Sequence, residues 1–181
     1  MSMKSTVNLS IVGLLLAGFL SLSPALKAAG TQNDSREVSA LLSQAETHAF
    51  QLKAEASQLE ADVRLGMRSD LSWETHVAKI TEIKEELNKV AQTVGKLNGS
   101  RGTASPWQQQ AIDRINPVLR ELAANIQSTI NHLKEHQQEI TSCVQTDPEY
   151  KDHVTALSEL ATRMASEIAN SVESGEAKTK L

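Results

Sequence analysis

The sequence is poor in the residues that build disulfide-linked domains and β-sheet domains. It contains one Cys, four Pro and eight Gly, and aromatic residues make up 3% of its 181 residues. A single Cys excludes an intrachain disulfide scaffold, and so few aromatic and turn residues disfavour a β-sandwich or barrel. Apolar residues, at 40%, are too numerous for a disordered chain. One helical domain is the class that remains.

The first 28 residues have the layout of a secretory signal peptide. Lys4 precedes an apolar stretch, and a polar segment with small residues follows it. We predict cleavage after Ala28, with cleavage after Ala25 as the alternative. The apolar stretch covers 16 residues from position 7 to position 22, short of the roughly 20 that a membrane-spanning helix needs. We therefore expect a cleaved leader and no transmembrane segment in the mature chain.

Removal of this leader makes the chain more acidic. It leaves 153 residues, the size of one domain. It also takes away Lys4 and Lys27, so the formal net charge goes from −4 to −6. A negative domain without a basic run is poorly suited to nucleic acid or to anionic lipid surfaces. We therefore expect an exported domain, periplasmic or secreted, that binds no nucleic acid.

Four segments carry an apolar seam, meaning apolar residues spaced alternately three and four apart as in packed helices. The seams run over 38–66, 73–97, 112–143 and 150–172. Turn and capping residues separate them, and both Ser105-Pro106 and Asp147-Pro148 place a capping residue before a Pro. We predict helices at about 34–68, 72–98, 106–145 and 148–173.

The connections between these helices set the predicted topology. Two connections have about two to four residues and the third has eight, too short to cross back along a helix of about 40 Å. Sequential helices must then be antiparallel neighbours, and the heptad spacing predicts left-handed knobs-into-holes packing. We predict an all-α fold, an antiparallel up-down-up-down four-helix bundle with coiled-coil-like packing. Its parts are a signal peptide at 1–28, a short arm at 29–33, the bundle at 34–174 and a disordered tail at 175–181.

Two residues of the third helix stand out from the pattern. Pro117 removes a backbone hydrogen bond inside the helix and is expected to curve or kink it. Cys143 falls on the third seam, where it is either a small buried hydrophobe or a thiol that joins two chains in an oxidising compartment.

Motifs for catalysis are few. The sequence has no HExxH, CxxC, GxGxxG or phosphate-loop motif, and no Glu has a His three residues later, as ferritin-like metal bundles require. The segment from His132 to His136 spells the inverted HxxEH zinc-protease pattern. The small all-helical chain is the wrong context for that chemistry. We predict no catalytic residues and no enzyme activity.

Three histidines from different helices are predicted to meet at one end of the bundle. His76 and His153 follow the starts of the second and fourth helices, and His136 precedes the end of the third. Their heights along the bundle differ by only about 2–6 Å. Three imidazoles suit Zn or Cu, and possible additional ligands nearby are Glu149, Asp152 and Cys143. The alternative is that His76 and His136 are hydrogen-bonded core-edge residues that destabilise the bundle when they protonate near pH 6.

The leading functional hypothesis is an exported, non-enzymatic bundle with a structural or partner-binding role. The partner is another protein or a second copy of the same chain. This hypothesis requires no cofactor. The second hypothesis is Zn or Cu binding by His76, His136 and His153. The third is binding to lipid or membrane surfaces by amphipathic helices that open from the bundle.

Overall fold

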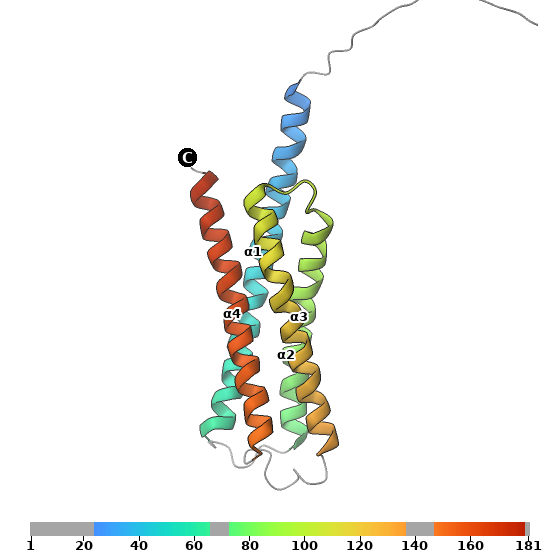
Figure 1. Ribbon diagram of the computed structural model, residues 1–181, viewed down its shortest axis with the longest axis vertical. Coiled ribbons are helices and arrows are strands. Elements are labelled where there is room, and N and C mark those ends of the chain that lie inside the picture. Colours follow the sequence, from blue (N-terminus) through green and yellow to red (C-terminus); the bar gives the residue numbers. More distant parts are fainter. Residues whose placement is uncertain (1–23, 66–72, 137–146, 180–181) are drawn as a thin grey trace, which may run out of the picture.

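A computed structural model describes the chain over residues 24–65, 73–136 and 147–179. The described residues form four helices, shown in Figure 1: α1 (Pro24–Leu65), α2 (Trp73–Gly99), α3 (Pro106–Glu135) and α4 (Pro148–Thr179). No strand occurs among the residues in these ranges. The prediction of an all-α fold made of four packed helices is confirmed.

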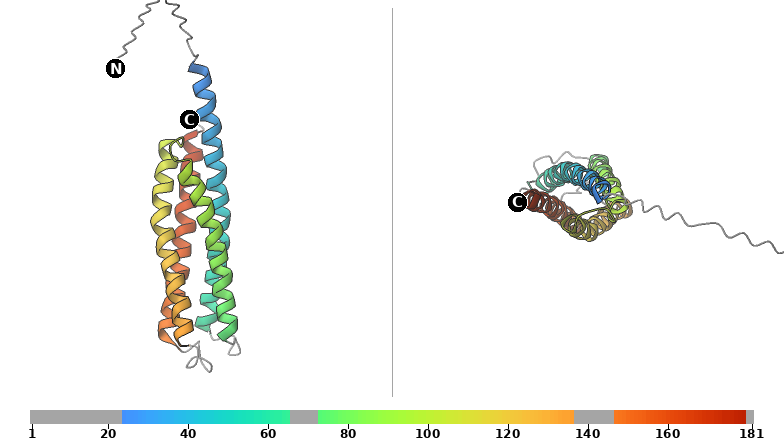
Figure 2. Two further views of the ribbon diagram at one scale, coloured as in Figure 1. Left: turned by 90° about the vertical axis from the view of Figure 1, so that its right-hand side faces the viewer. Right: turned by 90° about the horizontal axis from the view of Figure 1, so that it is seen from above.

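The four helices enclose one core. α1 packs on α2 and α4, and α3 packs on the same two helices, so the view from above shows a closed ring (Figure 2). The starts of α2 and α4 and the ends of α1 and α3 lie together at one end of the bundle, which we call the distal end (Figure 1). There, Trp73 Nε1 donates a hydrogen bond of 2.8 Å to the carbonyl of Leu133.

The apolar seams account for most of the core. Every apolar seam position of α1 from Val38 to Val63 is at most 2% exposed. Ala occupies three of these positions, and its small side chain lets neighbouring helices approach closely. In α3, Leu119 was expected in the seam but is only partly buried, whereas its neighbour Val118 is 2% exposed. A 3.6-residue turn drifts relative to a 3.5-residue repeat, which moves the buried stripe by one position here.

A buried amide joins the starts of α1 and α3 at the opposite end. Gln108 is fully buried, and its Nε2 donates to the carbonyl of Ser35 at 2.8 Å and to Ser39 Oγ at 3.0 Å. Its Oε1 accepts the backbone N–H of Ser105 at 2.8 Å, which satisfies one of the free donors at the start of α3. One side chain therefore caps a helix and fixes its position against α1.

Helix lengths differ from the predicted ones. α1 begins at Pro24, so residues 29–33 are helical rather than an arm, although Gly30, Thr31 and Asn33 have low helix propensity. α3 ends at Glu135 with His136 as its C-cap, ten residues before the predicted end. Residues 137–146, with Cys143, lie outside the described ranges. Pro117 lies inside α3, which continues through it.

The end of α4 also differs from the predicted disordered tail. The helix continues to Thr179, and Gly175 does not end it. Gly175 is buried under the ring of Trp107 at the start of α3: a Cβ at this position would lie 2.3 Å from Cη2 of that ring. The glycine therefore serves close packing between α3 and α4 rather than a helix stop.

Candidate functional site

His76 is a buried core residue of α2. It is fully buried, as is Tyr150 of α4, and a hydrogen bond of 2.9 Å joins its Nδ1 to the Tyr150 hydroxyl. The two rings meet edge to face with centroids 5.3 Å apart. Burial lowers the pKa of His76 and raises that of Tyr150, so both groups are neutral at physiological pH. His76, predicted as a metal ligand, thus lies in the core and outside the group of three residues whose ligand atoms come together.

The distal end gathers a cluster of histidines and carboxylates around His132. This residue lies on the last turn of α3 and is 6% exposed. Its ring centroid is 4.6 Å from that of His136 and 5.6 Å from that of His153 on α4. Two of the three predicted histidines, His136 and His153, are therefore brought together, but through His132 and without His76.

Asp147 holds the ring of His132 in place. It is the residue before α4, and its Oδ1 accepts the backbone N–H groups of Glu149 at 2.9 Å and Tyr150 at 3.2 Å. Its Oδ2 is 2.8 Å from His132 Nε2. Burial acts to raise the pKa of Asp147, but the hydrogen bonds from His132, Tyr150 and Glu149 outweigh it, so the pKa lies below its ordinary value. An ionised carboxylate can only accept, so His132 Nε2 carries a proton and donates it.

Glu149 lies between the two imidazoles. Its Oε1 is 3.8 Å from His132 Nδ1 and 3.9 Å from His153 Nε2. One ligand atom from each of these three residues lies within 4.8 Å of the other two. Within the described ranges this is the group of three that could hold a metal ion. Asp152, suggested by the sequence as a further ligand, is exposed and outside this group.

Sequence reasoning missed the central place of His132. The signal was present, because His132 and His136 are one helical turn apart and either could face the bundle. The heptad pattern favoured His136, and Asp147 was interpreted only as a helix cap. A local pattern does not show that one carboxylate can cap α4 and hold a side chain of α3.

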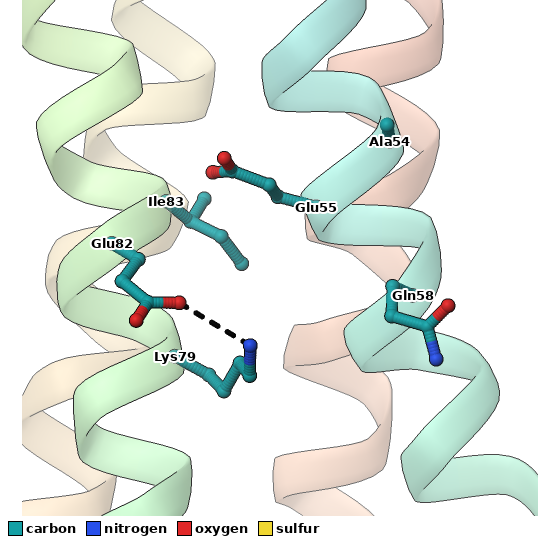
Figure 3. A pocket seen from close by; sticks show the side chains of 6 residues that line it. All are labelled: Ala54, Glu55, Gln58, Lys79, Glu82 and Ile83. Atoms are coloured by element: carbon teal, nitrogen blue, oxygen red, sulfur yellow. Dashed lines mark hydrogen bonds and ion pairs between the residues drawn. The ribbon is translucent and has the colours of Figure 1, made fainter.

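A second polar feature lies between α1 and α2. A hollow of about 240 Å³ separates these helices, lined by Ala54, Glu55 and Gln58 of α1 and by Lys79, Glu82 and Ile83 of α2 (Figure 3). We call it the α1/α2 groove. Figure 3 shows Glu55 reaching from α1 toward α2, whereas Lys79 and Glu82 form an ion pair of 3.3 Å along α2.

Carboxylates accumulate along this groove. Glu86, one turn beyond Glu82 on α2, is 5% exposed, forms an ion pair with Lys89 and lies 3.7 Å from His48 Nδ1. Oε2 of Glu86 and Oε2 of Glu55 are both buried and accept no hydrogen bond. Burial raises the pKa of Glu55, and the negative charges of Glu86 and Glu82 raise it further against the effect of a hydrogen bond from Gln51.

One large apolar side chain is exposed next to the groove. Phe50 of α1 is 47% exposed, the one such case among the described side chains. It precedes Ala54 by one helical turn, so it lies on the same face of α1 as the groove lining. The outer surface of α1 thus offers an exposed aromatic ring one turn before Ala54, a residue that lines the groove.

Within the described part of the chain, no helix is long and apolar enough to cross a membrane. Comparison of the chain with protein-family models, with curated proteins and with solved structures finds no match. Any function must therefore be inferred from the geometry of the distal cluster and of the α1/α2 groove.

Proposed function

We propose that the protein is an exported, non-enzymatic helical bundle that binds a protein partner through the α1/α2 groove. The observation that carries this proposal is Glu55, a carboxylate that lines the groove and has only one hydrogen bond, from the uncharged Gln51, while its Oε2 accepts none. Leaving such a group unsatisfied costs about 1–3 kcal/mol. A donor supplied by a partner would recover that free energy.

The charges of the groove define the partner's chemistry. Lys79 pairs with Glu82, and Lys89 pairs with Glu86. Glu55 has only a hydrogen bond of 3.4 Å from the uncharged Gln51. An Arg or Lys side chain from a partner would therefore be attracted to Glu55, and the exposed ring of Phe50, five residues earlier on α1, would provide apolar contact elsewhere on the outer face of that helix. The expected partner is a segment that carries a basic residue beside an apolar one.

A binding role fits the residues that line the groove better than a catalytic one. The lining supplies carboxylates, an amide and an ammonium group, and no Ser, Cys or His lines the hollow itself. Recognition of a basic segment needs charge and shape, which these residues provide. Binding should strengthen as the pH rises above the ordinary Glu value of 4.5, because the raised pKa of Glu55 keeps part of that carboxyl neutral near this pH.

The proposal includes the antiparallel up-down-up-down topology with coiled-coil-like packing. It is supported by contacts at the two ends of the bundle. Trp73 at the start of α2 bonds Leu133 near the end of α3, and Gln108 at the start of α3 bonds Ser35 in α1. In this topology each helix ends at the same end of the bundle where the next one begins, so a short segment can connect them.

Export is tested by fractionation and N-terminal sequencing. The full chain with a C-terminal epitope tag is expressed in a bacterial host. We expect it in the periplasmic or extracellular fraction, with a mature N-terminus at Ala29, or at Leu26 if the cut follows Ala25. A full-length product confined to the cytoplasm would refute the export part of the proposal.

Groove binding is tested with a pair of helical peptides. One contains Arg beside Phe, and in the other citrulline replaces Arg, which removes the charge and keeps the shape. We expect the Arg peptide to bind more tightly, and Glu55→Gln to weaken its binding at least about fivefold, or roughly 1 kcal/mol. The matched control is Glu159→Gln, which changes an exposed Glu of α4.

Three outcomes would contradict the partner proposal. One is equal affinity for the Arg and citrulline peptides. Another is wild-type affinity in the Glu55→Gln variant. The third is binding to vesicles with gained helicity and no binding to either peptide, which would favour the lipid-surface hypothesis instead.

A further inference from the structure

We propose that His132, Glu149 and His153 form a binding site for a divalent transition metal of the zinc type at the distal end of the bundle. The site is separate from the α1/α2 groove and does not depend on it. The residues come from two helices: His132 from the end of α3, and Glu149 and His153 from the first two turns of α4. Two imidazoles and one carboxylate are a ligand set that zinc accepts.

The hydrogen bond between His132 and Asp147 leaves one ring nitrogen available. Nε2 lies 2.8 Å from Asp147 Oδ2, so a neutral imidazole that donates through Nε2 has its lone pair on Nδ1. Nδ1 faces Glu149 Oε1 at 3.8 Å. Metal-bound histidines commonly donate their other ring N–H to a carboxylate, which fixes the ring and raises the basicity of the ligating nitrogen. Asp147 is thus a positioning residue for His132.

Asp147 is itself held rigidly. Two backbone N–H groups at the start of α4 bind its Oδ1, so the carboxylate cannot turn away from His132 without uncapping the helix. A ligand whose orienting partner is fixed loses little freedom when a metal binds. The geometry around His132 therefore exists before any ion arrives.

The spacing of the three ligand atoms also supports the site. Separations of 3.8 and 3.9 Å are too long for hydrogen bonds, so Glu149 satisfies neither imidazole directly. Tetrahedral zinc with bonds of about 2.0–2.2 Å places its ligand atoms roughly 3.3–3.5 Å apart. The three atoms, all within 4.8 Å of one another, need to approach by about 0.5–1.5 Å to meet that requirement.

The closing movement falls on Glu149 for its own two separations, and on the partly exposed His153 for the separation between the two imidazoles. The Glu149 side chain is 69% exposed, whereas His132 is 6% exposed and His153 is 21% exposed. A small rotation of Glu149 toward solvent-accessible space changes no core packing. Three protein ligands leave one position of a tetrahedral ion for water, and the His136 ring lies next to His132 at this point.

The consequence of binding would be a link between α3 and α4. His132 precedes residues 137–146 and Glu149 follows them, so the ion would close this segment of the chain at both ends. An ion that binds the folded state and not the unfolded state raises the melting temperature, and the stabilisation grows with the logarithm of the free ion concentration above its Kd. A structural role of this kind would strengthen the distal end without altering the groove.

Zinc binding by the mature chain provides the test. Protein freed of metal by a chelator is titrated with ZnCl₂ by calorimetry, and its melting temperature is measured with and without Zn. We expect one ion per chain and a higher melting temperature with Zn. His153→Ala and Glu149→Gln should each weaken binding at least about tenfold, and Glu159→Gln, a surface Glu ten residues further along α4, should not.

Two measurements separate the proposed geometry from weak surface binding of Zn. Asp147→Asn keeps a side chain that can cap α4 but removes the charge beside His132, so zinc affinity should fall about 10–100-fold while the metal-free protein stays folded. ¹⁵N NMR of the imidazoles should show coordination through Nδ1 of His132 and Nε2 of His153. The proposal is overturned by less than stoichiometric zinc, by wild-type affinity in His153→Ala and Glu149→Gln, or by coordination that excludes His132.

Discussion

Gly175→Ala is the substitution whose effect the structure predicts most sharply, because two known effects oppose each other there. In a helix interior, Ala is more stable than Gly by about 0.5–1 kcal/mol. At Gly175, however, the new Cβ would lie 2.3–2.5 Å from three ring carbons of Trp107. Carbon atoms in contact sit about 3.5–4.0 Å apart. The indole would therefore have to move by roughly 1–1.5 Å.

The magnitude follows from the cost of that movement. Overpacking of one methyl group in a closely packed contact costs about 1–3 kcal/mol. Subtracting the helix gain leaves a net destabilisation of roughly 0.5–2 kcal/mol for Gly175→Ala. Gly95→Ala is the matched control: it also lies inside a helix, and nothing stands within 4 Å of the position of its Cβ. It should stabilise the protein by about 0.5–1 kcal/mol.

Urea-induced unfolding followed by far-ultraviolet circular dichroism measures these differences. A double-mutant cycle then isolates the contact. On a Trp107→Ala background the obstruction is gone, and Gly175→Ala should become stabilising by about 0.5–1 kcal/mol. If Gly175→Ala stabilises the protein as much as Gly95→Ala while Trp107 is present, the close packing of α3 on the end of α4 is refuted.

Three further predictions concern the core and the third helix. Because burial lowers the pKa of His76 below its ordinary value of 6.5, the unfolded chain binds this proton first. The free energy of unfolding should therefore be highest above about pH 6.5 and fall by up to about 1.4 kcal/mol per pH unit as the pH drops further. Urea unfolding between about pH 5 and 7 should show this slope in the wild type. An equal slope in His76→Gln would contradict the assignment of the slope to His76. Leu52→Ala removes a fully buried side chain and should cost about 2–5 kcal/mol in the same assay, so a loss below 1 kcal/mol would contradict a closely packed core. Pro117→Ala restores a backbone donor inside α3 on an exposed position and should raise the free energy of unfolding by about 1–2 kcal/mol. A loss of stability would instead show that the backbone geometry imposed by Pro117 is needed for packing.

The His76–Tyr150 pair and the distal cluster differ in their exposure to solvent. His76 and Tyr150 are sealed in the core, where both stay neutral. His132, 6% exposed, and His153, 21% exposed, lie next to the exposed Glu149. The buried pair contributes to stability and its pH dependence, and the outer group is accessible to ions from solvent.

Much of the helical framework could be predicted from local patterns. The heptad spacing places Val38 and the residues that follow it in α1 in the core, and they are buried. Proline after a capping residue marks the starts of α3 and α4 at Pro106 and Pro148. These features are local: a helix start depends on a few adjacent residues, and a buried stripe depends on a repeat that recurs along one helix.

The tertiary structure alone decided the ends of the helices and the partners of the histidines. The sequence predicts a disordered tail from Gly175 onward, whereas in the structure α4 continues and the ring of Trp107, 68 positions earlier in the chain, packs against Gly175. His76, His132 and His136 all lie near a seam, and the rotation of each helix about its axis determines which of them turns inward. That rotation is set by the summed packing of the neighbouring helices rather than by any one residue. Spacing along the sequence therefore predicted a bundle with histidines at one end, and contacts between helices determined that Asp147 orients His132 toward Glu149 and His153.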